Sequence, residues 1–177
     1  MKKLFLYFIT LFSLLAFVPL ALAGEDIYQS PEAFLAETFG GTSPEKQTLT
    51  LSSEATEKMA KIMGTHYKLP TVEYWAQDGR TAWILEEIGK FEPITTGLVV
   101  SPNGKLERIK VLIYRESHGW EVKHKFFTRQ FKGASLKREK KLDKRIDGIS
   151  GATLSVNALK RLGALALILH KNVNSTP

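Results

Sequence analysis

Cysteine is absent from the 177-residue sequence, and its absence excludes several kinds of redox site. A c-type haem needs a C-x-x-C-H motif, and ordinary iron–sulfur clusters need thiolate ligands. Disulfides cannot stabilise the fold, although export from the cytoplasm would permit them. Redox chemistry in this chain would therefore need a cofactor that binds without a thiol.

Motifs for metal binding, hydrolysis and nucleotide turnover are also missing. Among the four histidines, His118 and His124 do not have the spacing of a standard metal site. Glu86 and Glu87 are neighbours on an expected strand, so their side chains point to opposite faces and cannot act on one substrate together. No G-x-S-x-G motif, Walker motif or Ser-His-Asp order is present. We therefore expect neither a metal site nor a hydrolase.

Positive charge is concentrated in Lys137–Arg145, where six of nine side chains are cationic. Glu139 and Asp143 interrupt this run and no aromatic residue lies within it, so nucleic-acid binding is not indicated. A solvated face is the simpler interpretation. A docking patch for an acidic redox partner is the second.

The first 23 residues have the pattern of a secretory signal peptide. A positive start is followed by the apolar run Leu4–Val18, by Pro19 and by a small-x-small ending at Ala23. We expect cleavage after Ala23 and a periplasmic protein. The alternative is an uncleaved anchor on the outer face of the inner membrane, because residues 4–23 are long enough to cross a bilayer.

The remaining chain, Gly24–Pro177, is long enough for one domain with a hydrophobic core. Without Lys2 and Lys3 its formal net charge falls from seven to five. We expect a mostly helical segment over residues 24–80 that packs as one unit with a second segment, residues 81–177.

Helical and strand patterns alternate along this chain, which indicates an α+β fold with helices packed on an antiparallel sheet. The expected elements, from residue spacing and turn signals, are a helix over Pro31–Phe39 after the cap Ser30, a helix over Glu54–Met63 capped by Ser53, strands over Thr81–Ile88, Ile94–Ser101 and Lys105–Arg115, and a short helix over His124–Lys132. Asn103-Gly104 predicts a tight hairpin turn between the second and third of these strands. In the third strand, Ile109, Val111 and Ile113 are expected to share one face.

The C-terminal pattern is the clearest and predicts a long amphipathic helix over Ser155–Lys171, with Ser155 as its N-cap. The apolar positions that define its buried stripe are Val156, Leu159, Leu162, Ala166 and Leu169.

A glycine-rich and hydroxyl-rich turn, Asp147–Ser155, leads directly into this helix. The unpaired N–H groups and the partial positive charge of a helix N-terminus can bind a phosphate group. Gly151 and Ala152 would let the backbone approach a ligand closely, and Thr153 places a hydroxyl there. By spacing alone, a structural turn is the simpler interpretation.

This turn resembles the signature of the FMN-binding domain family, which includes covalently flavinylated subunits of sodium-translocating quinone reductase and of the Rnf complex. The signature is an aspartate, two variable residues, Ser or Thr, then Gly-Ala-Thr, and a hydroxyl residue two positions later. Here it reads Asp147, Gly148-Ile149, Ser150, Gly151-Ala152-Thr153 and Ser155. The resemblance extends over about Thr81–Lys171 and points to the small exported members. It also includes the segments Ala82–Lys90, Pro93–Gly97, Tyr114–Val122 and Phe127–Gly133.

The resemblance implies that a flavin transferase joins FMN through a phosphoester to Thr153. It implies cofactor contacts from the signature and from a second stretch near the flavin: Ser150, Gly151, Ala152, Ser155, Asp147, Glu116, His118, Gly119 and Trp120. In the second stretch, His118 stands where the respiratory subunits have proline. Asp147 would repel a phosphate, so it either serves the transferase or is a simple turn residue. Trp120, His118 and Tyr114 either lie against the flavin ring or fill the core.

We therefore expect an exported electron carrier with covalent FMN, which exchanges electrons with a membrane or periplasmic redox partner. A carrier is favoured over a complete enzyme because no substrate pocket is evident. The alternatives are a flavin-dependent extracytoplasmic reductase and a cofactor-free exported binding module.

Overall fold

The computed structural model describes residues 24–64, 70–137 and 141–174. The expected signal peptide or anchor, residues 1–23, lies outside these described residues. Within the described ranges, no helix has the length and apolar character needed to cross a bilayer.

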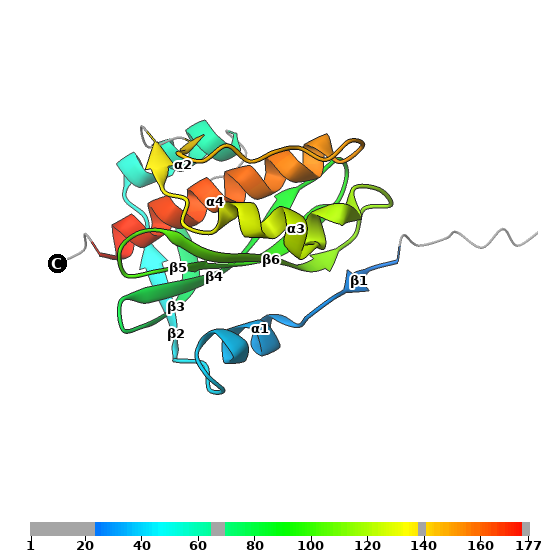
Figure 1. The fold of residues 1–177 in the computed structure, drawn as a ribbon. Coiled ribbons are helices and arrows are strands. Elements are labelled where there is room, and N and C mark those ends of the chain that lie inside the picture. Colours follow the sequence, from blue (N-terminus) through cyan, green and yellow to red (C-terminus); the bar gives the residue numbers. More distant parts are fainter. Residues whose placement is uncertain (1–23, 65–69, 138–140, 175–177) are drawn as a thin grey trace, which may run out of the picture.

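An antiparallel sheet forms the centre of the protein, and its six strands in the described chain follow the order β1-β6-β5-β4-β3-β2 (Figure 1). The strands are β1 (Asp26–Ile27), β2 (Lys46–Thr50), β3 (Thr71–Gln77), β4 (Arg80–Ile88), β5 (Pro93–Val100) and β6 (Leu106–Tyr114). The three expected strands correspond to β4, β5 and β6, and the α+β class is confirmed.

Helices pack on both faces of this sheet (Figure 1). The helical elements are α1 (Pro31–Thr38), α2 (Ser53–Met63), η1 (Trp120–Lys123), α3 (Lys125–Thr128), η2 (Arg129–Phe131) and α4 (Thr153–Val173). A small hairpin of β7 (Leu136–Lys137) and β8 (Lys141–Leu142) lies beside α4. α4 crosses one face of the sheet with α2 packed against it, while α1 covers the other face.

The larger core lies between α4 and the sheet. All five apolar positions of the predicted stripe on α4 are buried there, because a helix of this period presents one continuous face to the strands. Trp83 of β4 is fully buried and stacks on Tyr74 of β3 with ring centroids 5.2 Å apart. α4 is therefore held rigidly against the sheet along its length.

A smaller core lies under α1, where Phe34 and Leu35 pack against the opposite face of the sheet. Ser30 caps α1 as predicted, its Oγ accepting the Ala33 N–H at 3.1 Å. Gly97 of β5 makes room for the Phe34 ring, because a Cβ at this position would lie 2.7 Å from ring carbons.

The prediction that Ile109, Val111 and Ile113 share one face of β6 is wrong at Ile113. Ile109 and Val111 belong to the large core, but Ile113 packs against the smaller core on the α1 side. A shift of register occurs here, since Thr95 pairs with Ile113 whereas Thr96 pairs with Val111. Such a bulge inserts one residue and reverses the alternation of faces beyond it.

Residues 24–80 contain three strands, β1, β2 and β3, in addition to α1 and α2. A mostly helical segment was predicted for these residues. In β3 the exposed and buried residues alternate at first, with Val72 and Tyr74 turned to the core. This alternation, together with β-branched and aromatic residues, was the signal available for the strand.

Two helix starts also differ from prediction. α2 begins at Ser53 and its cap is Ser52, whose Oγ accepts the Ala55 N–H at 3.2 Å. α4 begins two residues before Ser155, so Ser155 lies inside the helix. The expected helix over 124–132 is shorter and is divided into α3 and η2, although Phe127 and Phe131 are both fully buried as expected of core residues.

Candidate functional site

The glycine-rich turn before α4 lies against the loop that follows β6, although the two are far apart in the sequence. Tyr114, the last residue of β6, connects them. Its hydroxyl donates to the His118 carbonyl oxygen at 2.6 Å and lies 2.9 Å from Ser155 Oγ. Since the phenol has one hydrogen, the Ser155 hydroxyl is the donor in the second bond. Burial raises the pKa of Tyr114, so this group stays protonated as a donor.

Gly119 brings the loop into close contact with α4. Its φ is 87°, and a Cβ there would lie 2.8 Å from Ser155 Oγ and 2.9 Å from the Tyr114 hydroxyl oxygen. Both the left-handed backbone and the missing side chain are therefore required at this position. The structure thus brings two expected site residues, Gly119 and Ser155, together.

The first turn of α4 differs from an ordinary helix start. Its N-cap position is Ala152, no side chain caps it, and its first turn contains no acidic residue. Thr153, the first helical residue, is exposed, and so is Leu154 after it. The first backbone N–H groups of a helix have no partner within the helix. Backbone N–H donors that have no partner within the helix therefore lie beside the exposed Thr153 hydroxyl.

The other residues of the signature divide into exposed and buried positions. Ser150 and Gly151 are exposed, and Gly151 has a φ of 82°. Ala152 and Ser155 are buried. Ser155 was expected to cap the helix and to contact the cofactor. The prediction of a cap is wrong, because Ser155 lies inside the helix and its hydroxyl is bonded to Tyr114.

Asp147 lies on the surface at the start of the turn. Its carboxylate pairs with Arg145 at 3.1 Å, and its backbone N–H donates to Gln130 Oε1 at 2.8 Å. Neither contact distinguishes a role in maturation from that of a turn residue. Both interpretations of Asp147 stay open.

Glu116 fixes the turn between β4 and β5. Its Oε1 accepts the backbone N–H groups of Lys90, Phe91 and Glu92, the last two at 2.6 and 3.1 Å. Carboxylates bonded to several N–H groups order a turn strongly. In this structure Glu116 therefore shapes the region around the site.

Exposed aromatic residues flank this region. Trp120 is 43% exposed and meets the His124 ring edge-on, with centroids 5.5 Å apart. Lys123 Nζ lies over the rings of both Tyr28 and Trp120, at 4.1 and 4.9 Å from their centroids. Trp120 is therefore accessible, as a residue facing a flavin ring would be, whereas the Tyr114 ring is buried.

His118 is exposed, and its Nδ1 lies 3.0 Å from Ser117 Oγ. Its carbonyl oxygen, rather than its ring, forms the contact that organises the loop. Histidine at this position is compatible with the loop because only its backbone is used.

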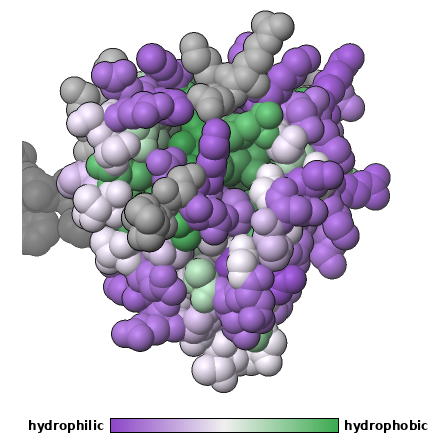
Figure 2. Space-filling model, turned by 90° about the vertical axis from the view of Figure 1, so that its left-hand side faces the viewer, coloured by the Kyte–Doolittle hydropathy of each residue, from purple (hydrophilic) through white to green (hydrophobic). Residues whose placement is uncertain are grey.

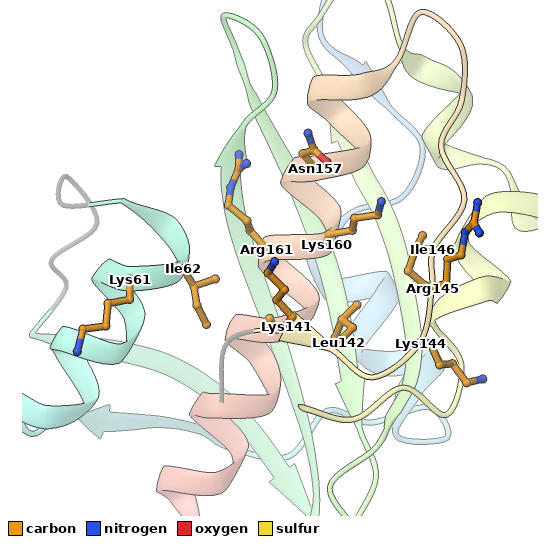
Figure 3. Close-up of a pocket in the computed structure, with 11 residues that line it drawn as sticks. Lys61, Ile62, Lys141, Leu142, Lys144, Arg145, Ile146, Asn157, Lys160 and Arg161 are labelled. Atoms are coloured by element: carbon orange, nitrogen blue, oxygen red, sulfur yellow. The ribbon is translucent and has the colours of Figure 1, made fainter. Parts of the chain in front are cut away.

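A cationic cavity of about 570 Å³ lies on the outer side of α4 (Figure 3). Among the described residues, its lining contains no carboxylate and six cations from α2, from the segment 141–146 and from α4: Lys61, Lys141, Lys144, Arg145, Lys160 and Arg161. Figure 3 shows Lys160 extending from α4 toward the 141–146 segment, and Lys141 extending from that segment across α4. Arg161 is ion-paired with the buried Glu87 at 2.6 Å.

The basic run Lys137–Arg145 was expected to form a solvated face, and this cavity was not predicted. Lys160 and Arg161 lie on a helix well beyond the basic run, so no local pattern connects them to it. None of the expected cofactor residues lines the cavity. Asn157, which does line it, follows Thr153 by one helical turn.

Groups of three or more His, Asp or Glu side chains that could hold a metal ion do not occur among the described residues.

Residues 89–167 match the family model of the FMN-binding domain. The matched range begins in the β4–β5 turn held by Glu116 and ends within α4, so it contains both segments of the site. The comparison with curated proteins gave no match.

Proposed function

Because residues 89–167 match the FMN-binding domain family, we propose that FMN is joined through its phosphate to the Thr153 hydroxyl and transfers electrons outside the cytoplasm. A bound FMN would supply the redox chemistry, while the protein sets its position and electrostatic surroundings. The observation that carries this proposal is the uncapped start of α4 with an exposed threonine hydroxyl at its first residue.

The residues at the start of α4 fit a phosphate group. The helix dipole places partial positive charge there, and the first N–H groups point toward an incoming anion. The exposed Gly151, with its positive φ, leaves the approach to Thr153 open, since no atom lies within 4 Å of a Cβ built on it. Ser150 adds a second exposed hydroxyl beside the approach.

Attachment by ester formation defines the roles of the atoms. In this step Thr153 Oγ1 would form a bond to the phosphorus of a flavin phosphoanhydride while the anhydride P–O bond breaks. The second phosphate group would leave with the hydroxyl proton, so the protein gains the mass of FMN less one water. A flavin transferase is the expected partner for this step. Asp147 is placed on the surface, where a maturation enzyme can reach it.

The accessible site supports a carrier more than a complete enzyme. Thr153 and Leu154 are exposed on α4, and Trp120 is exposed on the neighbouring loop. A group attached at this position stays open to an electron donor and to an acceptor. We propose that both are extracytoplasmic or membrane partners, since the N-terminal sequence has the pattern of an export signal.

The test is the intact mass of the chain recovered from cells that make a flavin transferase. The parent is expected to carry one FMN less one water, the T153A variant none, and the T153S variant, which keeps the hydroxyl, some or all of the parent's amount. S150A is the matched control for a neighbouring exposed hydroxyl and is expected to be labelled.

An unlabelled parent beside a second, labelled acceptor protein would overturn the covalent proposal and favour a binding module without cofactor. A labelled chain that reduces a small oxidant from a small donor, with no protein partner, would instead favour a flavin-dependent reductase.

A further inference from the structure

Large hydrophobic side chains are exposed mainly at one end of the protein, where α4 begins. We name this the site end and define it by residues 88–92, residues 115–126, β1 and the first turn of α4. The described residues with large, exposed apolar side chains are Ile27, Ile88, Phe91, Trp120, Phe126 and Leu154.

Contacts within this end link the segments that carry these side chains. Glu116 holds the backbone of Phe91 to the loop that contains Gly119, and Gly119 packs against Ala152 and Ser155 at the start of α4, the helix that carries Leu154. Lys123 lies over both Trp120 and Tyr28, the neighbour of Ile27. Phe126 joins them through His124, whose ring is stacked on it and meets Trp120 edge-on.

The opposite end of the protein has a different surface. Figure 2 shows polar side chains over most of it, with apolar surface confined largely to a recess in the upper half. Contiguous exposed apolar surface marks an interaction site for protein or lipid. The composition of the site end therefore bears on the kind of partner that would cover it.

We propose that the site end lies against a lipid surface, an inference that builds on the exported location proposed above. Aromatic and aliphatic side chains project from turns, and lysines lie over two of the aromatic positions. Lys90 Nζ is 4.7 Å from the Phe91 ring centroid, and Lys123 Nζ is 4.9 Å from that of Trp120. Amphipathic aromatic rings and lysines with apolar stems are the residues favoured at a bilayer interface.

Chain connectivity selects lipid over a protein partner. The apolar sequence Leu4–Ala23 ends next to Gly24, and three residues later Ile27 belongs to the exposed surface. Three extended residues span at most about 11 Å. If this sequence is retained as an anchor, which is the alternative to cleavage after Ala23, the site end is the part of the protein that lies next to the membrane.

This placement has a consequence for the proposed function. Thr153 begins the helix whose second residue, Leu154, belongs to the apolar surface. A group carried by Thr153 would therefore lie at the membrane boundary, within reach of a lipid-soluble electron donor or acceptor such as a quinol or quinone.

The experiment uses the intrinsic fluorescence of the flavin-free chain, made without a transferase, so that it does not depend on flavin attachment. The chain is mixed with vesicles of about three parts phosphatidylethanolamine to one part phosphatidylglycerol, with or without acyl chains brominated close to the headgroup. Bromine quenches only a tryptophan that contacts lipid. The chain has three tryptophans; Trp83 is fully buried.

Quenching in the parent and in W75F, but not in W120F, is the expected result. F91S is expected to weaken partitioning of the chain lacking residues 1–23 by about tenfold, because it removes part of the apolar area that enters the interface. The described core lies wholly within residues 24–174, so this shortened chain retains it.

Emission unaffected by brominated lipid would overturn the proposal. Self-association in solution that F91S abolishes, with no quenching in vesicles, would overturn it in favour of an interface between two copies. Neither result would affect the mass test of Thr153.

Discussion

The start of α4 and the start of α2 show what a helix N-terminus looks like with and without a side-chain cap. α2 has a serine cap, Ser52, and an acidic residue, Glu54, in its first turn. α1 has the same arrangement with Ser30 and Glu32. α4 is the longest helix of the described chain and has neither feature.

The difference between these helix starts lies in what stabilises each helix. Caps and acidic residues satisfy the free N–H groups and the positive end of the dipole in α1 and α2. In α4 no side chain caps those groups, and the helix is held by burial of its apolar stripe instead. A long, well-packed helix tolerates an uncapped end because tertiary contacts supply most of its stability.

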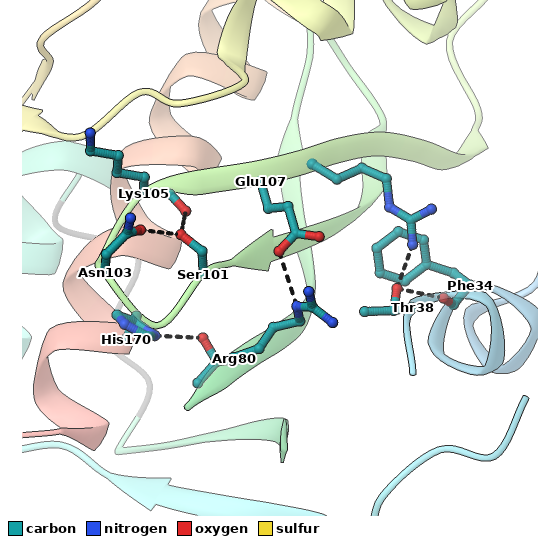
Figure 4. A network of polar contacts seen from close by, with 10 residues as sticks. Phe34, Thr38, Arg80, Ser101, Asn103, Lys105, Glu107 and His170 are labelled. Carbon is teal, nitrogen blue, oxygen red and sulfur yellow. Dashed lines mark hydrogen bonds and ion pairs between the residues drawn. The ribbon is translucent and has the colours of Figure 1, made fainter. Parts of the chain in front are cut away.

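The two ends of α4 also differ from each other. At its C-terminal end, His170 is buried and its Nδ1 lies 2.8 Å from Thr81 Oγ1 (Figure 4). Thr81 Oγ1 also accepts the Trp83 Nε1–H at 2.9 Å, and Asn174 Nδ2 lies 3.0 Å from His170 Nε2. These polar groups are paired within the protein, whereas Thr153 at the start of α4 is exposed.

The largest expected effect tests the contact that shapes the start of α4. G119A should lower the free energy of unfolding by about 3 kcal/mol, because it combines a positive φ with a collision against Ser155 and Tyr114. G104A is the matched control, since Gly104 has a φ of 70° but open space around it, and should cost about 1 kcal/mol. Urea unfolding of both variants measures the difference. Equal losses would show that the packing against α4 contributes nothing.

A smaller effect is expected at the capped helix. S52A should lower the free energy of unfolding by about 1 kcal/mol, because the Ala55 N–H loses its acceptor. S53A, one residue later and inside the helix, should have almost no effect. Thermal melting of the pair would contradict the assignment of the cap if S53A proved the more damaging change.

The smallest effect concerns pH and the opposite end of α4. Burial lowers the pKa of His170, so the folded state binds this proton less readily than the unfolded state, in which the pKa is about 6.5. Stability from this group is therefore complete above about pH 6.5 and is lost as the pH falls below it. Uptake of the proton by the unfolded chain limits the loss between about pH 7.5 and 5.5 to about 1.4 kcal/mol, and because the folded imidazole also binds some proton we expect less than about 1 kcal/mol.

The measurement is the free energy of unfolding in urea at the two pH values for the parent and for H170Q. The variant is expected to be less stable at both values but to show a weaker pH dependence. An unchanged dependence would assign the effect to other groups.

Local patterns were sufficient for the parts of the fold that rest on short-range physics. Ser30-Pro31 gave the start of α1, Asn103-Gly104 gave the β5–β6 turn, and apolar spacing gave the buried face of α4. The strands β2 and β3 were missed because they belong to segments with weaker patterns and gain their stability from pairing with each other.

The candidate site was predictable only in part. Thr153 and the residues before it were found from their order in the sequence. The cationic cavity was not, because it needs α2, β8 and α4 to meet. Glu116 was expected beside the cofactor, but its contacts with the 90–92 backbone give it a structural role that no sequence pattern indicated.

Residue type and spacing along a few turns of chain were enough to predict α1, the strands β4 to β6, the apolar stripe of α4 and the hydroxyl at its first turn. Packing in three dimensions makes Ser155 a buried partner of Tyr114, excludes a side chain at Gly119 and reverses the faces of β6 at a bulge. These features depend on contacts between residues as far apart as Tyr114 and Ser155, 41 positions along the chain, which no local preference specifies.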